Sequence, residues 1–296
     1  MDATSRTTKH EPVLSRSDTD FFHKNGYIVV PNAVPKQNCE NLIDTIFQFL
    51  GVERNNPDTW YRPPVCPSGN VEIYQHQALW DNRQYPRVHG AFSDIYNDHK
   101  LWVSLDRAAM RPPQRADQPR FNMKLFTHWD MDVSKVAPGF LAVQGVLCLN
   151  DAPPELGGFT CVPGFHKILN EWIAAHPEDA ESRRPDVSKF PPGYTLQPVP
   201  ANAGDLIIWD MRLPHGNGYN VSDRPRLAQY ISMYRAGKDG KAREDRVRRW
   251  RERLPASWAP GDVRGWEQQN CKTAELSPLG RKLLGLDLWE DEPQRA

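Results

Sequence analysis

The segment FTHWD, residues 126–130, is the part of the chain on which the predicted fold and site depend. We expect residues 120–130 to form a strand. Alternate side chains of a strand leave from one face, so the imidazole of His128 and the carboxylate of Asp130 would lie side by side. With a second imidazole from His215, they would make the two-histidine, one-carboxylate triad that binds non-haem Fe(II) and leaves the opposite positions open. Taken alone, the pair also fits a structural hydrogen bond.

The sequence around His215 supports the first interpretation. The turn and apolar strand AGDLIIWD (203–210) precede His215, which we place in a Gly-rich loop beyond the end of that strand. Further on, DRPR (223–226) leads directly into an apolar strand. A guanidinium at the head of such a strand is costly to bury without a carboxylate partner, and arginine pairs with carboxylates through two parallel hydrogen bonds. A dicarboxylate cosubstrate is therefore a natural partner for this arginine cluster.

Strand parity adds further candidates for the site. On the predicted strand 120–130, Asn122 and Lys124 share the face of His128, where they would contact a cosubstrate or substrate, or else lie at the rim of the barrel. Gln144 interrupts the apolar strand 141–149 and needs a partner if it is buried, either a cosubstrate carboxylate or a group in the core. Trp129 points to the opposite face, where it would line an entrance or pack in the core.

The remaining pattern predicts a mainly β protein with flanking helices. Apolar residues at helical spacing, with Pro and Gly at the boundaries, predict helices over 17–25, 35–50, 86–98, 168–176, 241–253 and 278–286. Short β-branched or apolar runs predict strands over 27–30, 101–106, 120–130, 141–149, 158–162, 194–199, 206–209 and 227–234. The strand 141–149 is expected to be central. The helix 241–253 is rich in arginine, which fits a solvated amphipathic helix better than a phosphate-binding site.

Composition excludes several classes of protein. The 37 Lys and Arg residues balance 37 Asp and Glu residues, so we expect no nucleic-acid partner. No apolar run approaches the roughly 20 residues that span a bilayer, and neither a signal peptide nor a peroxisomal C-terminal tripeptide is visible, which predicts a cytoplasmic protein with no membrane partner. The five scattered cysteines predict reduced thiols. No pattern indicates an oligomeric state.

Taken together, these motifs resemble the phytanoyl-CoA dioxygenase family of Fe(II)- and 2-oxoglutarate-dependent oxygenases. The resemblance runs from about residue 18 to about residue 234 and rests on the H-x-D motif and on three further segments. They are FFHKNGYIVVPNAV (21–34), GGFTCVPGFH (157–166), and AGDLIIWD (203–210) before the distal histidine, which an arginine follows 11 residues later.

The resemblance implies a double-stranded β-helix, or jelly-roll, core, and it assigns roles to individual residues. His128, Asp130 and His215 would bind iron, and Arg226 would bind the distal carboxylate of 2-oxoglutarate. Arg224 competes for that role, but it precedes a proline in a turn, whereas Arg226 begins the strand. The common serine two positions after the distal histidine is Asn217 here, which could also donate to a carboxylate. His166 is expected to have a structural role and not to be a fourth iron ligand.

The resemblance also implies the reaction and the organisation of the chain. Fe(II), 2-oxoglutarate and O2 would be used to hydroxylate a small organic molecule, with release of succinate and CO2. Desaturation, epimerisation and ring formation would use the same residues. The carboxylate at position 130 argues against a halogenase, which needs that position vacant. We expect a flexible tail (1–16), a dioxygenase domain (17–235) and a C-terminal helical extension packed on it (236–296).

Two other classes of protein could share parts of this pattern. A zinc hydrolase can use the same three ligands, but it has no need of a buried arginine after the last one. A non-catalytic jelly-roll binding module would be expected to lack a ligand or the arginine.

The aromatic residues Trp60, Tyr61, Tyr74 and Trp80 lie in the long insert 52–90, so a partly apolar substrate is expected. Neither a CoA thioester nor a secondary metabolite is favoured.

Overall fold

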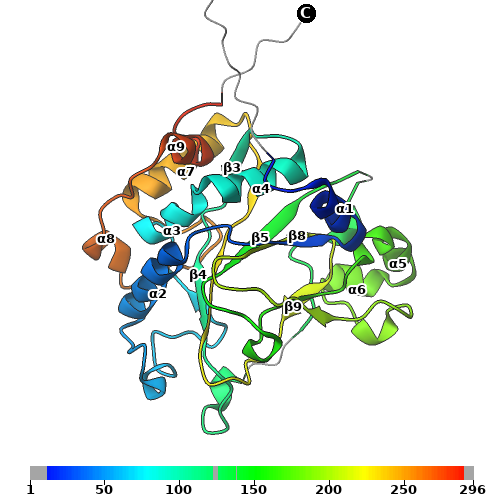
Figure 1. Ribbon diagram of the computed structural model, residues 1–296, viewed down its shortest axis with the longest axis horizontal. Coiled ribbons are helices and arrows are strands. Elements are labelled where there is room, and N and C mark those ends of the chain that lie inside the picture. Colours follow the sequence, from blue (N-terminus) through cyan, green and yellow to red (C-terminus); the bar gives the residue numbers. More distant parts are fainter. Residues whose placement is uncertain (1–11, 123–125, 138, 290–296) are drawn as a thin grey trace, which may run out of the picture.

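The computed structural model describes residues 12–122, 126–137 and 139–289, and it consists of antiparallel sheets with helices packed around them (Figure 1). The strands are β1 (Tyr27–Val30), β2 (Asn70–Val71), β3 (Leu101–Val103), β4 (Ala108–Arg111), β5 (Val143–Cys148), β6 (Phe159–Cys161), β7 (Gln197–Pro198), β8 (Leu206–Asp210), β9 (His215–Asn217), β10 (Arg226–Tyr230) and β11 (Met233–Arg235). The α-helices are α1 (Arg16–Asn25), α2 (Lys36–Leu50), α3 (Gln77–Arg83), α4 (Pro86–Tyr96), α5 (Leu169–Ala175), α6 (Pro177–Ser182), α7 (Gly240–Glu252), α8 (Trp266–Asn270) and α9 (Pro278–Leu284).

The largest sheet has six strands in the order β1-β8-β5-β10-β4-β2, with β5 in its interior as expected. Its two faces belong to different hydrophobic clusters because side chains alternate along each strand. Leu206 and Ile208 of β8 face the cluster that also contains residues of α2, α3 and α4, whereas Ile207 and Trp209 face the cluster that contains β6. One face of the sheet is therefore covered by helices, and the other faces the second sheet.

The second sheet has the order β7-β6-β9, and it completes the predicted jelly roll. Gly216 of β9 pairs with Thr160 of β6, and a Cβ at Gly216 would lie 2.8 Å from the carbonyl oxygen of Phe126. The segment 126–130 thus crosses β9 at a distance that only glycine permits. In Figure 1, β9 lies below β5 and β8.

Two predicted strands and one predicted loop differ from the structure. In the described part of 120–130, Pro119–Phe121 is a 3₁₀ turn and only His128 pairs with another strand, through one bridge to His215. His215 itself lies in β9 and not in a loop, because β6 supplies a partner for its backbone. The single strand predicted at 227–234 is two strands, since the chain leaves β5 after Tyr230 and pairs with β3 from Met233.

The two ends of the described chain pack on the core. Of the predicted N-terminal tail, residues 1–11 lie outside the described residues. The backbone N–H groups of Val13 and Leu14 donate to the carboxylate of Asp94, and Leu14 is buried, so the folded part begins before residue 17. At the other end, Leu283 and Leu284 of α9 belong to the helix-side cluster. The five cysteines are free, and no helix among the described residues could cross a membrane.

One arginine of the predicted amphipathic helix α7, Arg246, is buried in the contact between α7, α9 and β3. Its guanidinium donates to the carbonyl oxygens of Val103 at 2.6 Å, Leu283 at 3.1 Å and Leu284 at 3.0 Å, and to the hydroxyl of Tyr234 at 2.6 Å. Burial lowers the pKa of Arg246. This side chain therefore fastens the C-terminal helices to the edge of the sheet.

Replacing Arg246 by Met is expected to lower the free energy of unfolding by roughly 2–5 kcal/mol, because three buried carbonyl groups would lose their donor. The measurement is urea denaturation followed by circular dichroism. The matched control is Arg248→Met on the same helix, whose side chain is 47% exposed and pairs with acidic neighbours, and there we expect a change within about 0.5 kcal/mol. Equal effects of the two substitutions would contradict this account of Arg246.

Candidate active site

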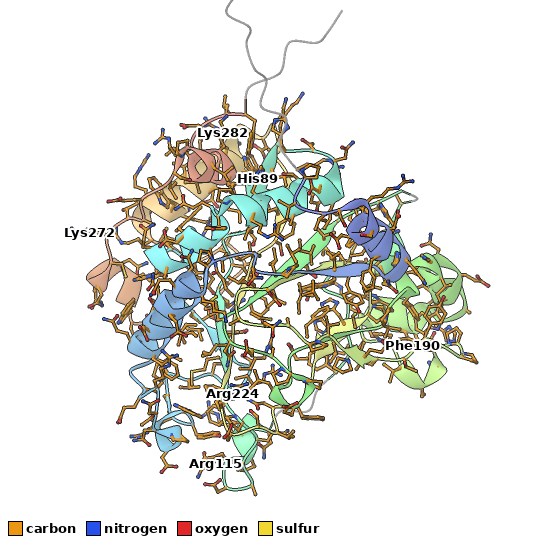
Figure 2. All side chains as sticks on the ribbon, in the orientation of Figure 1. His89, Arg115, Phe190, Arg224, Lys272 and Lys282 are labelled. Carbon is orange, nitrogen blue, oxygen red and sulfur yellow. The ribbon has the colours of Figure 1, made fainter. Side chains whose placement is uncertain are left out.

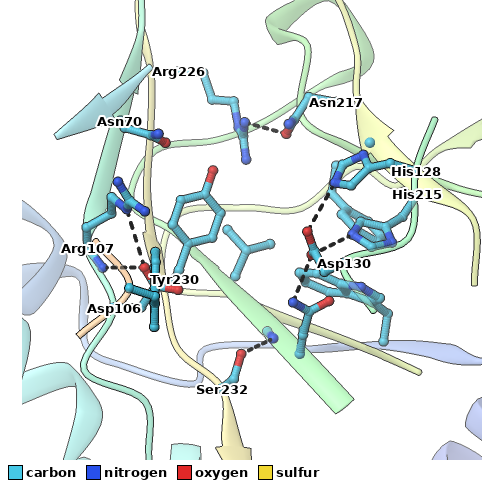
Figure 3. A pocket seen from close by; sticks show the side chains of 17 residues that line it. Asn70, Asp106, Arg107, His128, Asp130, His215, Asn217, Arg226, Tyr230 and Ser232 are labelled. Atoms are coloured by element: carbon cyan, nitrogen blue, oxygen red, sulfur yellow. Dashed lines mark hydrogen bonds and ion pairs between the residues drawn. The ribbon is translucent and has the colours of Figure 1, made fainter. Parts of the chain in front are cut away.

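The side chains of His128, Asp130 and His215 converge at the wall of a cavity of about 440 Å³. Nε2 of His215 lies 3.2 Å from Oδ2 of Asp130, and Nε2 of His128 lies 3.5 Å from Oδ1 of the same carboxylate. One potential ligand atom from each residue lies within 4.8 Å of the other two. Figure 3 shows the three side chains directed toward one another on one side of the cavity. Two imidazoles and a carboxylate at this spacing fit an Fe(II) ion.

Hydrogen bonds around the triad favour the binding of a cation. Nδ1 of His215 donates to the carbonyl oxygen of Leu213 at 3.0 Å, so Nε2 is the ring nitrogen directed at Asp130 and would be the one that binds a metal. Burial raises the pKa of Asp130, but hydrogen bonds from His128, His215 and Gln144 outweigh burial and hold this pKa well below its usual range. Asp130 is therefore ionised at neutral pH and available as a ligand.

Gln144 supports the triad from β5. Its Nε2 donates to Oδ2 of Asp130 at 2.8 Å, so the structure places it against a ligand of the predicted iron site. The sequence suggested either a cosubstrate carboxylate or a group in the core as the partner of Gln144, and the observed partner, Asp130, is neither of these. Because the hydrogen bond fixes one carboxylate oxygen, Gln144 orients Asp130 toward the two imidazoles.

Replacing Gln144 by Met keeps the length of the side chain and removes the hydrogen bond to Asp130. Losing such a partner of a metal ligand typically costs about 10–100-fold in metal affinity, so the Fe(II) concentration for half-maximal 2-oxoglutarate turnover should rise by about that factor. The control is Gln197→Met in β7, which is exposed. An unchanged Fe(II) dependence in the Gln144 variant would show that this hydrogen bond does not orient Asp130.

Arg226 enters the same cavity from the start of β10. It is buried, and its Nη1 donates to Oδ1 of Asn217 at 2.6 Å, so the two predicted carboxylate-binding residues lie side by side. Arg111 of β4 pairs with Arg226 across the sheet, and burial together with the charge of Arg226 lowers the pKa of Arg111. Of these two arginines only Arg226 lines the cavity, and its buried guanidinium makes this end favourable for an anion.

Arg224, the competing residue, lies elsewhere. It lines a second hollow between α2 and the loop before β10, and it donates to the carbonyl oxygen of Asp151 (Figure 2). The difference arises because Arg226 begins β10, whereas Arg224 lies in the turn before the strand. Arg226, Ala228 and Tyr230 face the interior between the two sheets, while Leu227 faces the helices.

Other predicted residues do not reach the site. The side chain of Asn122 bonds to the backbone of Arg115, at the lower tip of the molecule in Figure 2, and does not line the cavity. The 3₁₀ turn at Pro119–Phe121 replaces the strand that would have directed it inward. Lys124 lies outside the described residues. Trp129 is buried in the core, and His166 bonds to the carbonyl oxygen of His23, as expected for a structural residue.

The aromatic residues that line the cavity are not those expected from the insert 52–90. Trp80 and Tyr74 are among the most deeply buried side chains, and Trp60 lines the second hollow. This expectation was wrong because the insert packs its aromatic residues into the helix-side cluster. In the described structure, the aromatic residues at the cavity are Phe159, Trp209, Tyr230 and Trp258.

A further group of residues lines the cavity and was not predicted from the sequence. Asp106 and Arg107 lie on the side opposite the triad in Figure 3, and Asn70 and Ser232 complete that region. Trp258 comes from the C-terminal segment, between α7 and α8. Asp106 at the end of the predicted strand 101–106 and Arg107 directly after it were a weak signal, and Trp258 gave none.

Comparison with known proteins identifies the family that this geometry suggests. Residues 22–228 match the phytanoyl-CoA dioxygenase family. Among similar sequences, the Ava biosynthesis cluster protein O of Aspergillus versicolor is 28% identical over 239 residues, which cover 72% of this chain and 76% of that protein.

Two solved structures share the fold at low sequence identity. The GlcNAc Inducible Gene 2 protein of Candida albicans has a TM-score of 0.69 and 13% identity, and the match covers 97% of this chain and 80% of that one. The epimerase SnoN in complex with Fe3+, alpha ketoglutarate and nogalamycin RO has a TM-score of 0.51 and 15% identity, covering 88% and 94% of the two chains. These likenesses confirm the predicted jelly-roll fold.

Proposed function

The chain belongs to the phytanoyl-CoA dioxygenase family, and on this premise we propose that it hydroxylates a C–H bond of a small organic molecule. It is a 2-oxoglutarate-dependent non-haem iron oxygenase that uses Fe(II), 2-oxoglutarate and O2. In the balanced reaction, one oxygen atom of O2 enters the substrate as a hydroxyl group and the other enters succinate, while 2-oxoglutarate loses CO2. The single observation that carries the proposal is the convergence of His128, Asp130 and His215 on one side of a cavity that also contains Arg226.

The side chains at the two ends of the cavity have separate tasks. His128, Asp130 and His215 would hold the iron, which supplies the activation of O2 when it is bound. Arg226 would bind the distal carboxylate of 2-oxoglutarate, and Asn217 holds the guanidinium in place through its side-chain oxygen. Phe159 stacks on His215 with ring centroids 5.9 Å apart and limits the access of water to that ligand.

The organisation of the chain is part of the proposal. We place the catalytic unit at residues 17–235, with 236–296 as a helical extension packed on it. The contact of α9 with β3 and the hydrogen bonds of Arg246 support this division. The extension also brings Trp258 to the cavity. Desaturation, epimerisation and ring formation remain alternative outcomes of the same site, and the mass of the product distinguishes hydroxylation from each of them.

The test is the conversion of 2-oxoglutarate to succinate by the purified protein in air, followed by 13C NMR. Turnover should require added Fe(II), should cease with a chelator, and should not be restored by Zn(II). The control variant is Arg224→Ala, which should behave like the wild type because Arg224 lines a different hollow. Turnover that persists without iron, or 2-oxoglutarate that is left unused in the presence of iron, would contradict the proposal.

A further inference from the structure

The side of the cavity opposite the triad carries a group of residues that neither iron nor 2-oxoglutarate requires. It is formed by Asp106 and Arg107, which follow β3, and by Trp258, which precedes α8. We call these three residues the distal wall. Figure 3 shows Asp106 and Arg107 across the cavity from His128 and Asp130. A substrate held between the distal wall and the triad would have one end recognised and the other exposed to oxidation.

Trp258 is positioned to contact a ligand. Its side chain is 62% exposed although it lines the cavity, and the guanidinium of Arg107 lies 4.8 Å from the centre of its ring. The segment before it is fastened to the core, because Arg249 donates to the carbonyl oxygen of Pro255 at 2.7 Å and Gln75 donates to that of Leu254 at 2.9 Å. The exposed part of the ring therefore offers a fixed apolar surface at the rim of the cavity.

The segment after Trp258 is held as well. Glu267 in α8 accepts hydrogen bonds from the backbone N–H groups of Tyr74 at 2.8 Å and Gln75 at 2.6 Å. Both ends of this loop are thus tied to the insert that precedes α3. Trp258 is part of the cavity and not a mobile cover over it.

The distal wall presents the carboxylate of Asp106 to the cavity. Arg107 pairs with Glu72 and lies 3.6 Å from Asp106, so two carboxylates surround one guanidinium. Oδ1 of Asp106 accepts the backbone N–H of Arg107 at 2.8 Å, and the residue lines the cavity. Burial raises the pKa of Asp106, and the charges of Arg107 and Arg83 act in the opposite direction. A positively charged donor from the ligand would pair with this carboxylate where it lines the cavity.

We propose that the distal wall binds the substrate, and that this substrate is a planar apolar molecule with an amine, its ring against Trp258 and its ammonium group against Asp106. This inference rests on the proposed oxygenase function of the same cavity. Arg107 contacts both Trp258 and Asp106, so the ring and the amine of the substrate would be separated by a short linker.

The test uses three probes that share one ring and differ in their end group: tryptamine, indole-3-ethanol and indole-3-acetate. The protein is labelled with 5-fluorotryptophan, and the 19F signal of position 258 is assigned by its loss in Trp258→Phe. We expect tryptamine to shift this signal in a saturable way, with indole-3-acetate bound at least roughly tenfold more weakly. Asp106→Asn should remove the preference for the amine, because the amide keeps the acceptor for the N–H of Arg107 but loses the charge.

The control is Val263→Ala, a fully exposed residue of the same loop, which should leave all three titrations unchanged. Equal affinity for the three probes, or a preference for the amine that survives in Asp106→Asn, would overturn the assignment of an amine. A signal from position 258 that responds to no probe would overturn the binding role of Trp258. Each sample is also tested for Fe(II)-dependent turnover of 2-oxoglutarate, so failure of the distal wall is distinguishable from failure of the oxygenase function.

Discussion

Replacing Asp130 by Ala is expected to lower Fe(II)-dependent turnover of 2-oxoglutarate more than about 100-fold. Loss of a hydrogen-bonding partner outside the ligand set typically costs up to about 100-fold in metal affinity, and removal of a ligand should cost more. Asp130 contributes more than one bond, because its two oxygens face Nε2 of His128 and Nε2 of His215. Without the carboxylate, a metal ion would lose the only negative charge that the triad supplies.

The matched control for this substitution is Asp132→Ala. Asp132 lies two residues further along the same segment, and its carboxylate pairs with Lys135 outside the cavity. We expect normal turnover in the control and an unchanged melting temperature in both variants, since Asp130 is not part of the hydrophobic core. Substantial turnover in Asp130→Ala, with iron content equal to that of the wild type, would remove Asp130 from the ligand set.

Replacing Arg226 by Ala should raise the concentration of 2-oxoglutarate needed for half-maximal turnover by roughly 30-fold or more. The reason is that truncating one partner of a buried charge pair costs about 2–5 kcal/mol, and every 1.4 kcal/mol is about tenfold in affinity. Arg226 is buried, and among the described residues its side chain bonds to Asn217. Arg226→Lys should recover only part of the loss, because lysine cannot form two parallel hydrogen bonds to a carboxylate.

The control for Arg226 is Arg224→Ala, two residues earlier on the same chain segment. Arg224 was the alternative on sequence grounds, and its side chain lines the hollow next to α2. The dependence on 2-oxoglutarate should be unchanged in this variant, and the dependence on Fe(II) should be unchanged in both. The opposite pattern, a defect in the Arg224 variant alone, would reassign the carboxylate site.

Local patterns and the family resemblance together selected His128, Asp130, His215 and Arg226, and the structure brings all four residues to one cavity. Arg226 could be preferred over Arg224 because it begins the strand whereas Arg224 precedes a proline in a turn, and Gln144 was identified as a polar residue that would need a partner if buried. The prediction that Asn122 faces the site was wrong. Parity holds only within a strand, and a 3₁₀ turn occupies Pro119–Phe121.

The substrate side of the cavity depends on contacts that no local pattern encodes. Trp258 reaches the cavity only because α7 and α9 dock on the edge of the sheet, where Arg246 bonds to Val103, Leu283 and Leu284. The aromatic residues of the insert 52–90 are apolar in the same way as Trp258, yet Trp80 is fully buried. Composition alone does not distinguish an aromatic residue that fills a core from one that lines a cavity.

The most direct test of the iron and 2-oxoglutarate site is the visible absorbance of the protein under anaerobic conditions. We predict that a charge-transfer band appears only when Fe(II) and 2-oxoglutarate are both added to the wild type, and that His215→Ala shows no such band. The band should appear in Arg226→Ala at a much higher concentration of 2-oxoglutarate. A wild-type protein that gives no band with both additions, or a band of equal strength in His215→Ala, would contradict the assignment of this cavity as the oxygenase site.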